Sequence, residues 1–285
     1  MTGTRAAELD IVPVLDGVME LDPQDAFPGT SASDWEPHRD LLGPSGMIVM
    51  PYGGFLVGSP SGGITLVDTG GGPTFTVPPD KARLLQTGRL PESLDRLGVA
   101  PSRIDTVVLT HLHFDHIGWL APEGKPFFPN AEIVCHEADW AHFVNGPDIP
   151  DANVPARLTG CEDNLLLWDG ERCTRGDIVL RHTPGHTPGS CIVVTAGARG
   201  RAAIVGDLVH TPIEFIQTLD GIADTDPEMA AGTREAFKRE CLRSHITVWG
   251  SHFPAMNPGT LREGHQPGTT AWDVCCETSS PRQEQ

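Results

Sequence analysis

The sequence has 285 residues, a length within the range of one large α/β domain, so we predict a single core. Its 20 basic and 38 acidic side chains give a formal net charge of −18, which repels phosphodiester backbones and anionic lipid. We therefore expect no nucleic-acid partner and no membrane partner. No stretch approaches the roughly 20 apolar residues of a membrane span, and residues 1–10 lack the apolar segment of a signal peptide, so we expect a cytoplasmic protein.

Apolar residues follow strand and helix patterns along most of the chain. In the first half, the expected elements are a strand at 9–21, a loop rich in Pro, Gly and Ser at 22–44, strands at 47–57 and 64–67, a short helix at 91–97 and a strand at 104–109. In the second half, they are a strand at 131–135, a helix at 137–144, strands at 178–180, 191–195 and 202–205, a helix at 227–243 and a strand at 246–249. Strands come first in pairs and then alternate with helices, which predicts an α/β protein with an αββα sandwich of two mixed sheets flanked by helices.

We expect one domain at residues 1–263 and a C-terminal tail at 264–285. The tail is polar apart from Trp272 and Val274, and much of it is expected to be mobile. The loop at 22–44 is long for a compact domain, and loops of that length are commonly functional or disordered. It is therefore a candidate lid over an active site.

Four residues of metal-ligand type lie directly after the strand expected at 104–109. The segment HLHFDH contains His111, His113, Asp115 and His116. Alternate side chains of an extended segment point the same way, so His111 and His113 can bind one ion together, while Asp115 and His116 would face a second. Zinc accepts this set of nitrogen and oxygen donors.

Three further residues of this type follow other expected strands. His186 lies in TPGHTPG, Asp207 follows AAIVG, and His252 follows ITVWGS. A carboxylate has two oxygens, so Asp207 can bridge two ions that lie about 3.5 to 4 Å apart. Together the seven residues predict two zinc ions per chain.

The motifs resemble those of the metallo-β-lactamase superfamily. Its HxHxDH signature matches residues 111–116, and the similarity continues from Phe55 and LVDTG through TPGHTPG and VGD to GSHFP. The resemblance implies that Asp68 lies behind the ligands, where a buried carboxylate would orient a ligand histidine. It also implies a first zinc on His111, His113 and His186, a second on Asp115, His116 and His252, and Asp207 as the bridge.

Within the superfamily the chain is most similar to the N-acyl homoserine lactone lactonases and to their organophosphate-hydrolysing and aryl-ester-hydrolysing relatives. THLHFDHIGW, HEADW and GDLVHTPIEFIQ carry this resemblance. His113 stands where the flavodiiron branch has a glutamate, GDL at Asp207 departs from the true β-lactamases, and the negative charge disfavours the nucleases. The resemblance implies hydrolysis of a lactone or related ester.

One position departs from the well-known lactonases, which have a tyrosine three residues after the bridging aspartate. His210 stands there, and the only tyrosine is Tyr52. An imidazole can donate a hydrogen bond to a carbonyl oxygen as a phenol does, so His210 is a candidate catalytic residue, with a hydrogen bond to the backbone as the alternative. The organophosphate hydrolases resemble the histidine form, which leaves phosphotriester or aryl ester hydrolysis open.

Asp115 is the second candidate catalytic residue, because a free carboxylate oxygen could pass the nucleophile's proton to the leaving group. Trp35, Phe114, Trp119 and Phe215 are candidates for an apolar substrate pocket. Two readings from other classes stay open: a mononuclear iron dioxygenase that acts on a thiol, and a metal-binding protein without catalysis. A homodimer also stays open, because the sequence does not determine the oligomeric state.

Overall fold

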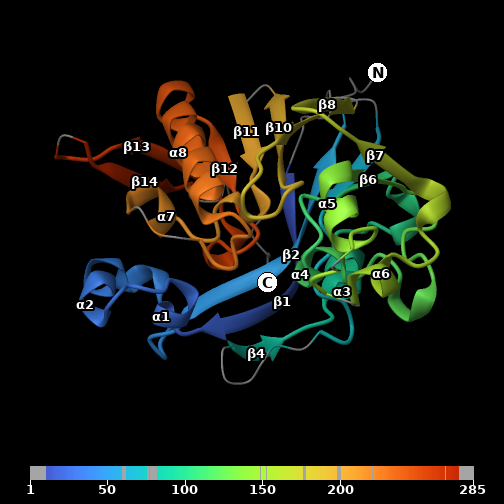
Figure 1. Cartoon of the computed structure of the whole chain (residues 1–285), viewed down its shortest axis with the longest axis horizontal. Helices are drawn as coiled ribbons and strands as arrows, with labels where there is room; N and C mark the ends of the chain where they lie inside the picture. Colours follow the sequence, from blue (N-terminus) through green and yellow to red (C-terminus); the bar gives the residue numbers. More distant parts are fainter. Residues whose placement is uncertain are drawn as a thin grey trace, which may run out of the picture.

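The computed structural model describes residues 11–59, 62–75, 77, 82–147, 149–151, 153–175, 178–197, 200–217, 219, 221–266 and 268–275. Within these residues two mixed sheets form the centre of the molecule, and helices lie outside them (Figure 1). The expected αββα sandwich is confirmed. None of the helices in the described part combines the length and apolar character that crossing a membrane requires.

The first sheet contains seven described strands from the first part of the chain. Across the sheet the order is β4 (Ala82–Gln86), β1 (Ile11–Leu21), β2 (Ile48–Gly58), β3 (Ile64–Val67), β5 (Thr106–Val108), β6 (Glu132–His136) and β7 (Leu165–Trp168). The pairs from β3 to β7 are parallel, and the pairs from β4 to β3 on the other side of the sheet are antiparallel.

The second sheet contains seven described strands from the later part of the chain. Across the sheet the order is β14 (Thr270–Val274), β13 (Gly259–Glu263), β12 (Thr247–Trp249), β11 (Gly200–Ile204), β10 (Cys191–Gly197), β9 (Ile178–His182) and β8 (Arg172–Arg175). The pair β11/β12 is parallel, and the other pairs are antiparallel.

Most of the helices are short, and α8 (Pro227–Ser244) is the longest among the described residues. The other α-helices are α1 (Pro23–Ala26), α2 (Ala32–Trp35), α3 (Leu90–Arg96), α4 (Phe114–Ile117), α5 (Glu137–Phe143), α6 (Asn153–Leu158) and α7 (Ile213–Ile216). The 3-10 helices are η1 (Glu36–Leu41), η2 (Pro101–Arg103), η3 (Pro122–Gly124), η4 (Glu162–Asn164), η5 (Gly206–Leu208) and η6 (Pro254–Met256).

Alternating side chains give each sheet two buried faces. In β5, Val108 packs between the sheets, while Val107 packs in the outer cluster that includes Leu94 of α3. In β10, Val193 packs between the sheets, while Ile192 packs in the outer cluster that includes residues of α8. Burial of each such side chain contributes roughly 1.5 to 3 kcal/mol, so the alternation favours the layered arrangement over a single exposed sheet.

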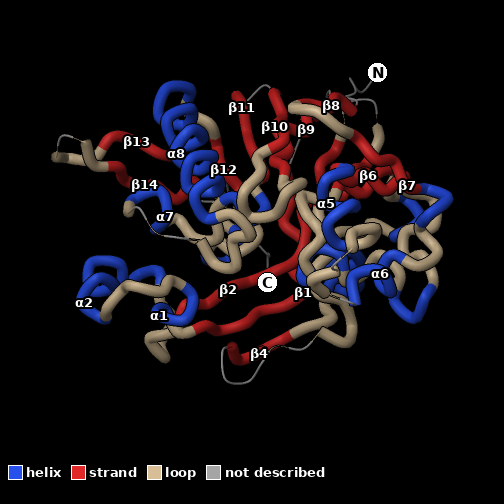
Figure 2. The backbone as a smooth tube through the Cα atoms, in the orientation of Figure 1, coloured by secondary structure: helices blue, strands red, loops and turns tan. Residues whose placement is uncertain are grey.

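The segment 22–44 differs from the loop expected from its composition, because α1, α2 and η1 occupy most of it (Figure 2). Asp22 caps α1 by accepting a hydrogen bond from the backbone of Gln24 at 2.8 Å. Phe27 and Trp35 are buried in one cluster with Tyr52. Helices of four residues are too short to show a periodic apolar pattern, which is why the sequence indicated a loop.

The boundary expected at residue 263 is also corrected. Residues 270–274 form β14, which pairs antiparallel with β13 and extends the second sheet. Trp272 packs on Phe215 and Phe253, with ring centroids 5.9 and 5.3 Å apart. The domain therefore includes residues up to Val274, and residues 276–285 of the expected tail lie outside the described part of the chain.

Candidate metal centre

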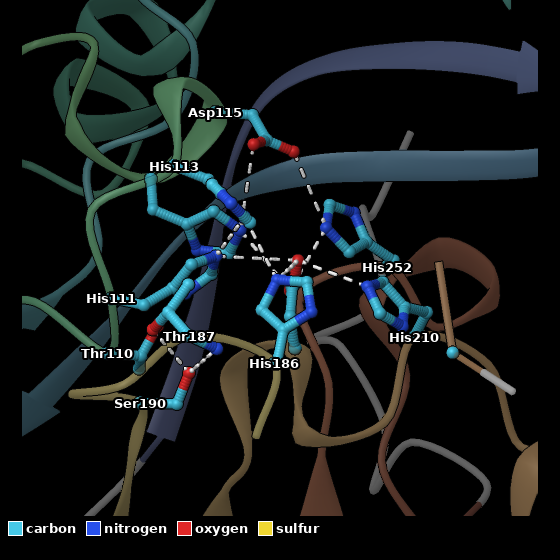
Figure 3. A network of polar contacts seen from close by, with 12 residues as sticks. Thr110, His111, His113, Asp115, His186, Thr187, Ser190, His210 and His252 are labelled. Carbon is cyan, nitrogen blue, oxygen red and sulfur yellow. Dashed lines mark hydrogen bonds and ion pairs between the residues drawn. The ribbon is translucent and has the colours of Figure 1, made fainter. Parts of the chain in front are cut away.

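Loops at strand ends bring the seven predicted ligands together from distant parts of the sequence. Figure 3 shows the labelled side chains of His111, His113, Asp115, His186 and His252 pointing toward one another. Two donor groups can each hold an ion. His111 and His113 follow β5, Asp115 and His116 lie in α4, His186 lies between β9 and β10, Asp207 lies in η5 after β11, and His252 follows β12.

The first donor group consists of His111, His113, His186 and Asp207. Nδ1 of His113 lies 3.1 Å from Nε2 of His111 and 2.9 Å from Nε2 of His186. Ligand nitrogens about 2.0 to 2.1 Å from a tetrahedral zinc would lie about 3.3 Å apart, so this spacing suits one ion. Oδ2 of Asp207 lies 3.6 Å from Nε2 of His111 and 3.5 Å from Nε2 of His186.

The second donor group consists of Asp115, His116 and His252. Oδ1 of Asp207 lies 3.2 Å from Nε2 of His116 and 3.2 Å from Nε2 of His252. Oδ2 of Asp115 lies 3.5 Å from Nε2 of His252, and Oδ1 of Asp115 lies 3.9 Å from Nε2 of His116. The two oxygens of Asp207 thus face different donor groups, as a bridging carboxylate would.

The outer ring nitrogens of three ligand histidines have acceptors that fix the ring orientation. Nδ1 of His116 donates to Asp68 at 2.8 Å, and Nδ1 of His252 donates to the carbonyl of Pro51 at 2.8 Å. Nδ1 of His186 donates to Asp224 at 3.1 Å. The three Nε2 atoms therefore face Asp207, where a bound cation would take the place of a proton.

Asp68 has a strained backbone at the site. It is fully buried, and its φ of 60° lies in the left-handed region, which costs a non-glycine residue about 1 to 3 kcal/mol. Its Oδ1 accepts the backbone N–H of Thr110 at 2.8 Å, and its Oδ2 accepts the Thr110 hydroxyl at 2.8 Å. Since Thr110 Oγ1 also lies 3.1 Å from Nδ1 of His111, Asp68 supports two ligand histidines at the position expected from the sequence.

Burial and mutual repulsion decide the charges of the donors. Burial and the nearby His116 lower the pKa of His111 well below its usual value, and burial and the nearby His186 do the same for the pKa of His113. Although burial opposes it, the charges of His116 and His252 hold the pKa of Asp207 well below its usual range. Although burial opposes it, the charges of Asp207 and Asp68 raise the pKa of His116 well above its usual value. Zinc binds neutral imidazoles and ionised carboxylates, so an ion here would displace the proton of His116, and the donor set fits the predicted ions.

His210 lies beside the two donor groups without belonging to either. Its Nε2 is 3.4 Å from Oδ2 of Asp207, and its ring centroid is 5.0 Å from that of His186. Oε2 of Glu214 accepts the backbone N–H of His210 at 2.6 Å and that of Thr211 at 2.9 Å. Although burial lowers it, the charges of Asp207 and Glu214 and their hydrogen bonds raise the pKa of His210 to about 10.

The sequence reasoning missed four buried polar residues around the site: Asp139, Glu214, Asp224 and Arg234. Asp139 in α5 accepts the backbone N–H of Leu112 at 3.0 Å, the Thr187 hydroxyl at 3.0 Å and the backbone N–H of Gly189 at 2.5 Å. It therefore ties the loop of His111 and His113 to the loop of His186. HEADW, which contains Asp139, was the only signal in the sequence.

The expected pocket side chains divide into two kinds. Phe114 is half-buried and stacks on Phe75 with ring centroids 5.0 Å apart, in the cluster that also buries Trp35. The expectation for Trp119 and Phe215 is corrected, because both are core side chains. Trp119 packs in the outer core of the first sheet and donates to Asp16 at 2.8 Å, and Phe215 is fully buried in the outer core of the second sheet.

Fold and site together define an αββα sandwich that gathers five histidines and two aspartates at loops from both sheets. The sequence profile of the Metallo-beta-lactamase superfamily matches residues 54–240, more than half of the chain. The chain belongs to this superfamily, and the family predicted from the sequence is confirmed.

The curated relatives include N-acyl homoserine lactonases. The N-acyl homoserine lactonase of Bacillus sp is 24% identical over 226 residues, which cover 75% of this chain and 86% of that protein. The N-acyl homoserine lactonase AiiB of Agrobacterium fabrum is 42% identical over 83 residues, which cover 28% of each chain.

Solved structures share the fold over nearly the whole chain. AidC, a dizinc quorum-quenching lactonase in complex with a product, matches with a TM-score of 0.79 and 21% identity over 96% of this chain and 100% of that one. The hydrolase AbOPH of the beta-lactamase superfamily matches with a TM-score of 0.80 and 20% identity over 97% of each chain.

Proposed function

We propose that the protein is a dinuclear zinc hydrolase that opens a lactone or a related ester. The observation that carries the proposal is the placement of the two carboxylate oxygens of Asp207. Its Oδ2 faces His111 and His186, and its Oδ1 faces His116 and His252. Lactonases among the curated relatives and among the structural neighbours support the substrate class.

His111, His113 and His186 would hold the first ion, Asp115, His116 and His252 the second, and Asp207 would contact both. Two zinc ions, when bound, would lower the pKa of a bound water to about 7 and polarise an ester carbonyl. A mononuclear iron centre is not favoured, because the buried donor group of Asp115, His116 and His252 would then hold no metal ion.

Asp115 is the residue proposed to move the proton. Its side chain is nearly buried, and its two oxygens lie 3.9 Å from His116 and 3.5 Å from His252. A carboxylate in this position accepts the proton of the attacking water and returns it to the leaving oxygen of the opened ring. The transfer lets the leaving group depart as an alcohol.

His210 is proposed to stabilise the negative charge that develops on the carbonyl oxygen. Its Nε2 lies 3.4 Å from Asp207, so the N–H is at the reaction centre, and Glu214 holds the backbone of the same residue. Hydrogen-bond donors fixed in place before the reaction are worth more than mobile ones, because they need no reorganisation in the transition state.

The segment 22–44 is proposed to cover the substrate. Phe27 and Trp35 pack in one cluster with Phe114, which separates His113 from Asp115 in the ligand motif. His38 of η1 and Gln217, the residue after α7, contact each other through their Nε2 atoms at 2.9 Å. An acyl chain or aromatic group would lie against this apolar cluster.

Hydrolysis of a substrate panel by the zinc-loaded protein tests the proposal. The panel contains acyl homoserine lactones, simple lactones, aryl esters and phosphotriesters, and we expect the highest kcat/KM for a lactone. Preference for an aryl ester or a phosphotriester would instead select the alternative that His210 leaves open. If protein with two bound zinc ions turned over none of the four substrate classes, the proposed hydrolase function would be contradicted.

A further inference from the structure

Arg234 is a buried cation in a helix that is otherwise largely polar and exposed. It lies in α8, and only 5% of its side chain is exposed. Two buried carboxylates flank it: its Nη2 lies 3.1 Å from Oδ2 of Asp224, and its Nε lies 3.3 Å from Oε1 of Glu214. The exposed fractions of these two acidic side chains are 1% and 0%.

Through Asp224, Arg234 reaches the first donor group. One oxygen of Asp224 accepts from Arg234, and the other accepts from Nδ1 of His186 at 3.1 Å. The backbone N–H of Gly221 donates to Asp224 at 3.0 Å and completes the contacts of that carboxylate. The orientation of the His186 ring therefore depends on a carboxylate that Arg234 holds.

Through Glu214, Arg234 reaches the segment that carries Asp207 and His210. Oε2 of Glu214 accepts two backbone N–H groups at 210 and 211, and its Oε1 lies 3.7 Å from Nδ1 of His210. Nε of Arg234 also donates to the carbonyl of Leu208 at 2.8 Å, one residue after Asp207. The guanidinium thus contacts the segment 208–211 directly at Leu208, and indirectly at residues 210 and 211 through its ion pair with Glu214.

The geometry requires arginine rather than a cation of any kind. A guanidinium has five N–H donors in a rigid plane, and here they serve Leu208, Asp224 and the carbonyl of Leu219 at 3.4 Å. A lysine ammonium is a single point charge and cannot contact all of these acceptors at once.

We propose that Arg234 is a positioning residue for both parts of the site, orienting His186 through Asp224 and the segment of Asp207 and His210 through Glu214 and Leu208. The inference rests on the proposed function, since the groups it positions are a metal ligand and the proposed oxyanion donor. It adds a route by which a residue outside the ligand set controls metal binding and turnover.

Titration of the metal-free protein with Co²⁺ tests the proposal, because the visible absorption of Co²⁺ reports the geometry of its ligands independently of turnover. The variants are Arg234→Lys, which keeps the charge, and Arg239→Met, a control in the same helix. Arg239 is 57% exposed and pairs only with Glu235 among the described residues. Thermal unfolding of each metal-free variant shows that it is folded.

We expect Arg234→Lys to weaken Co²⁺ binding about 10- to 100-fold and to change the absorption spectrum, as loss of groups that orient ligands does elsewhere. Arg239→Met should match the wild-type protein in Co²⁺ affinity and in absorption spectrum. Should Arg234→Lys bind Co²⁺ with unchanged affinity and spectrum, the positioning role is wrong. Failure of the unchanged protein to bind two Co²⁺ would instead overturn the proposed function.

Two isosteric variants test the contacts through Asp224 and through Glu214 separately, and they do not depend on the folding of an Arg234 variant. Asp224→Asn should weaken Co²⁺ binding, because His186 loses its charged acceptor. Glu214→Gln should weaken Co²⁺ binding less than Asp224→Asn does, because it touches no ligand side chain, and should lower kcat about 10- to 100-fold with little change in KM. Equal effects of both variants on Co²⁺ binding would contradict the separate roles of Asp224, which orients His186, and of Glu214, which holds the backbone at residues 210 and 211.

Discussion

Three of the proposed ligand histidines have outer partners of two chemical kinds, a carboxylate or a backbone carbonyl. His116 donates to the carboxylate of Asp68, His252 to the carbonyl of Pro51, and His186 to Asp224. Each partner selects the tautomer that leaves Nε2 free for a metal, so the structure has oriented these donors before an ion arrives. Preorganisation of this kind reduces the entropic cost of binding.

His210→Ala tests the proposed oxyanion donor at the scale of one residue. The substitution removes Nε2 near Asp207 but no member of either donor group. We expect kcat to fall roughly 10² to 10³-fold, with two zinc ions still bound. His210→Tyr is the matched control, because a phenol also donates a hydrogen bond; it should keep most of the turnover. Unchanged kcat in His210→Ala would assign the residue a structural role.

Among the elements, α5 connects the two loops that carry the first donor group. Asp139 accepts hydrogen bonds from both loops, at Leu112 and at Thr187 and Gly189. A Cβ atom at position 189 would lie 2.5 Å from the backbone nitrogen of Asp139, so glycine permits this close approach. The helix thus sets the distance between His113 and His186.

The buried carboxylate of Asp139 predicts a pH dependence of stability. Burial raises the pKa of this carboxyl to about 6 from the ordinary aspartate value of 3.8, so between these pH values the folded state holds a proton that the unfolded state has lost. The contribution of Asp139 to the free energy of unfolding therefore decreases as pH rises, by about 2 kcal/mol between pH 4.5 and 7.

Denaturant unfolding of the wild-type protein and of Asp139→Asn at both pH values measures this contribution. The difference in unfolding free energy between the two proteins should shift by about 2 kcal/mol in favour of Asp139→Asn at the higher pH. A pH-independent difference would mean that Asp139 titrates alike in the folded and unfolded states.

The sequence predicts the site better than it predicts the elements around it. Ligands that follow apolar strands are recognisable because a motif such as HLHFDH concentrates donors locally. Arg234 and Asp139 were not recognisable, since a charged residue in a helix is usually exposed and only the packing of the helix shows otherwise. β14 was missed because a short edge strand with polar neighbours resembles a tail.

At the scale of the whole molecule, the site joins the two sheets. His111, His113, Asp115 and His116 follow a strand of the first sheet, and His186, Asp207 and His252 follow strands of the second. Ions held by both sets would link the sheets at the edge where the ligand loops meet. Metal binding should therefore stabilise the whole fold rather than one loop.

Removal of metal by a chelator tests this link. An ion at a thousand times its dissociation constant stabilises the folded state by about 4 kcal/mol, which corresponds to a Tm decrease on the order of 8 °C when the ion is removed. We expect a single unfolding transition that moves to lower temperature and returns when zinc is added. An unchanged Tm after complete chelation would show that the ions do not connect the sheets.

The metal content of the purified protein tests the central claim most directly. Mass spectrometry of the wild-type protein should give two zinc ions per chain. Asp207→Ala, which removes the two carboxylate oxygens that face the two donor groups, should retain at most one zinc ion. One iron per chain in the wild-type protein, or two zinc ions in Asp207→Ala, would contradict a dinuclear site bridged by this aspartate.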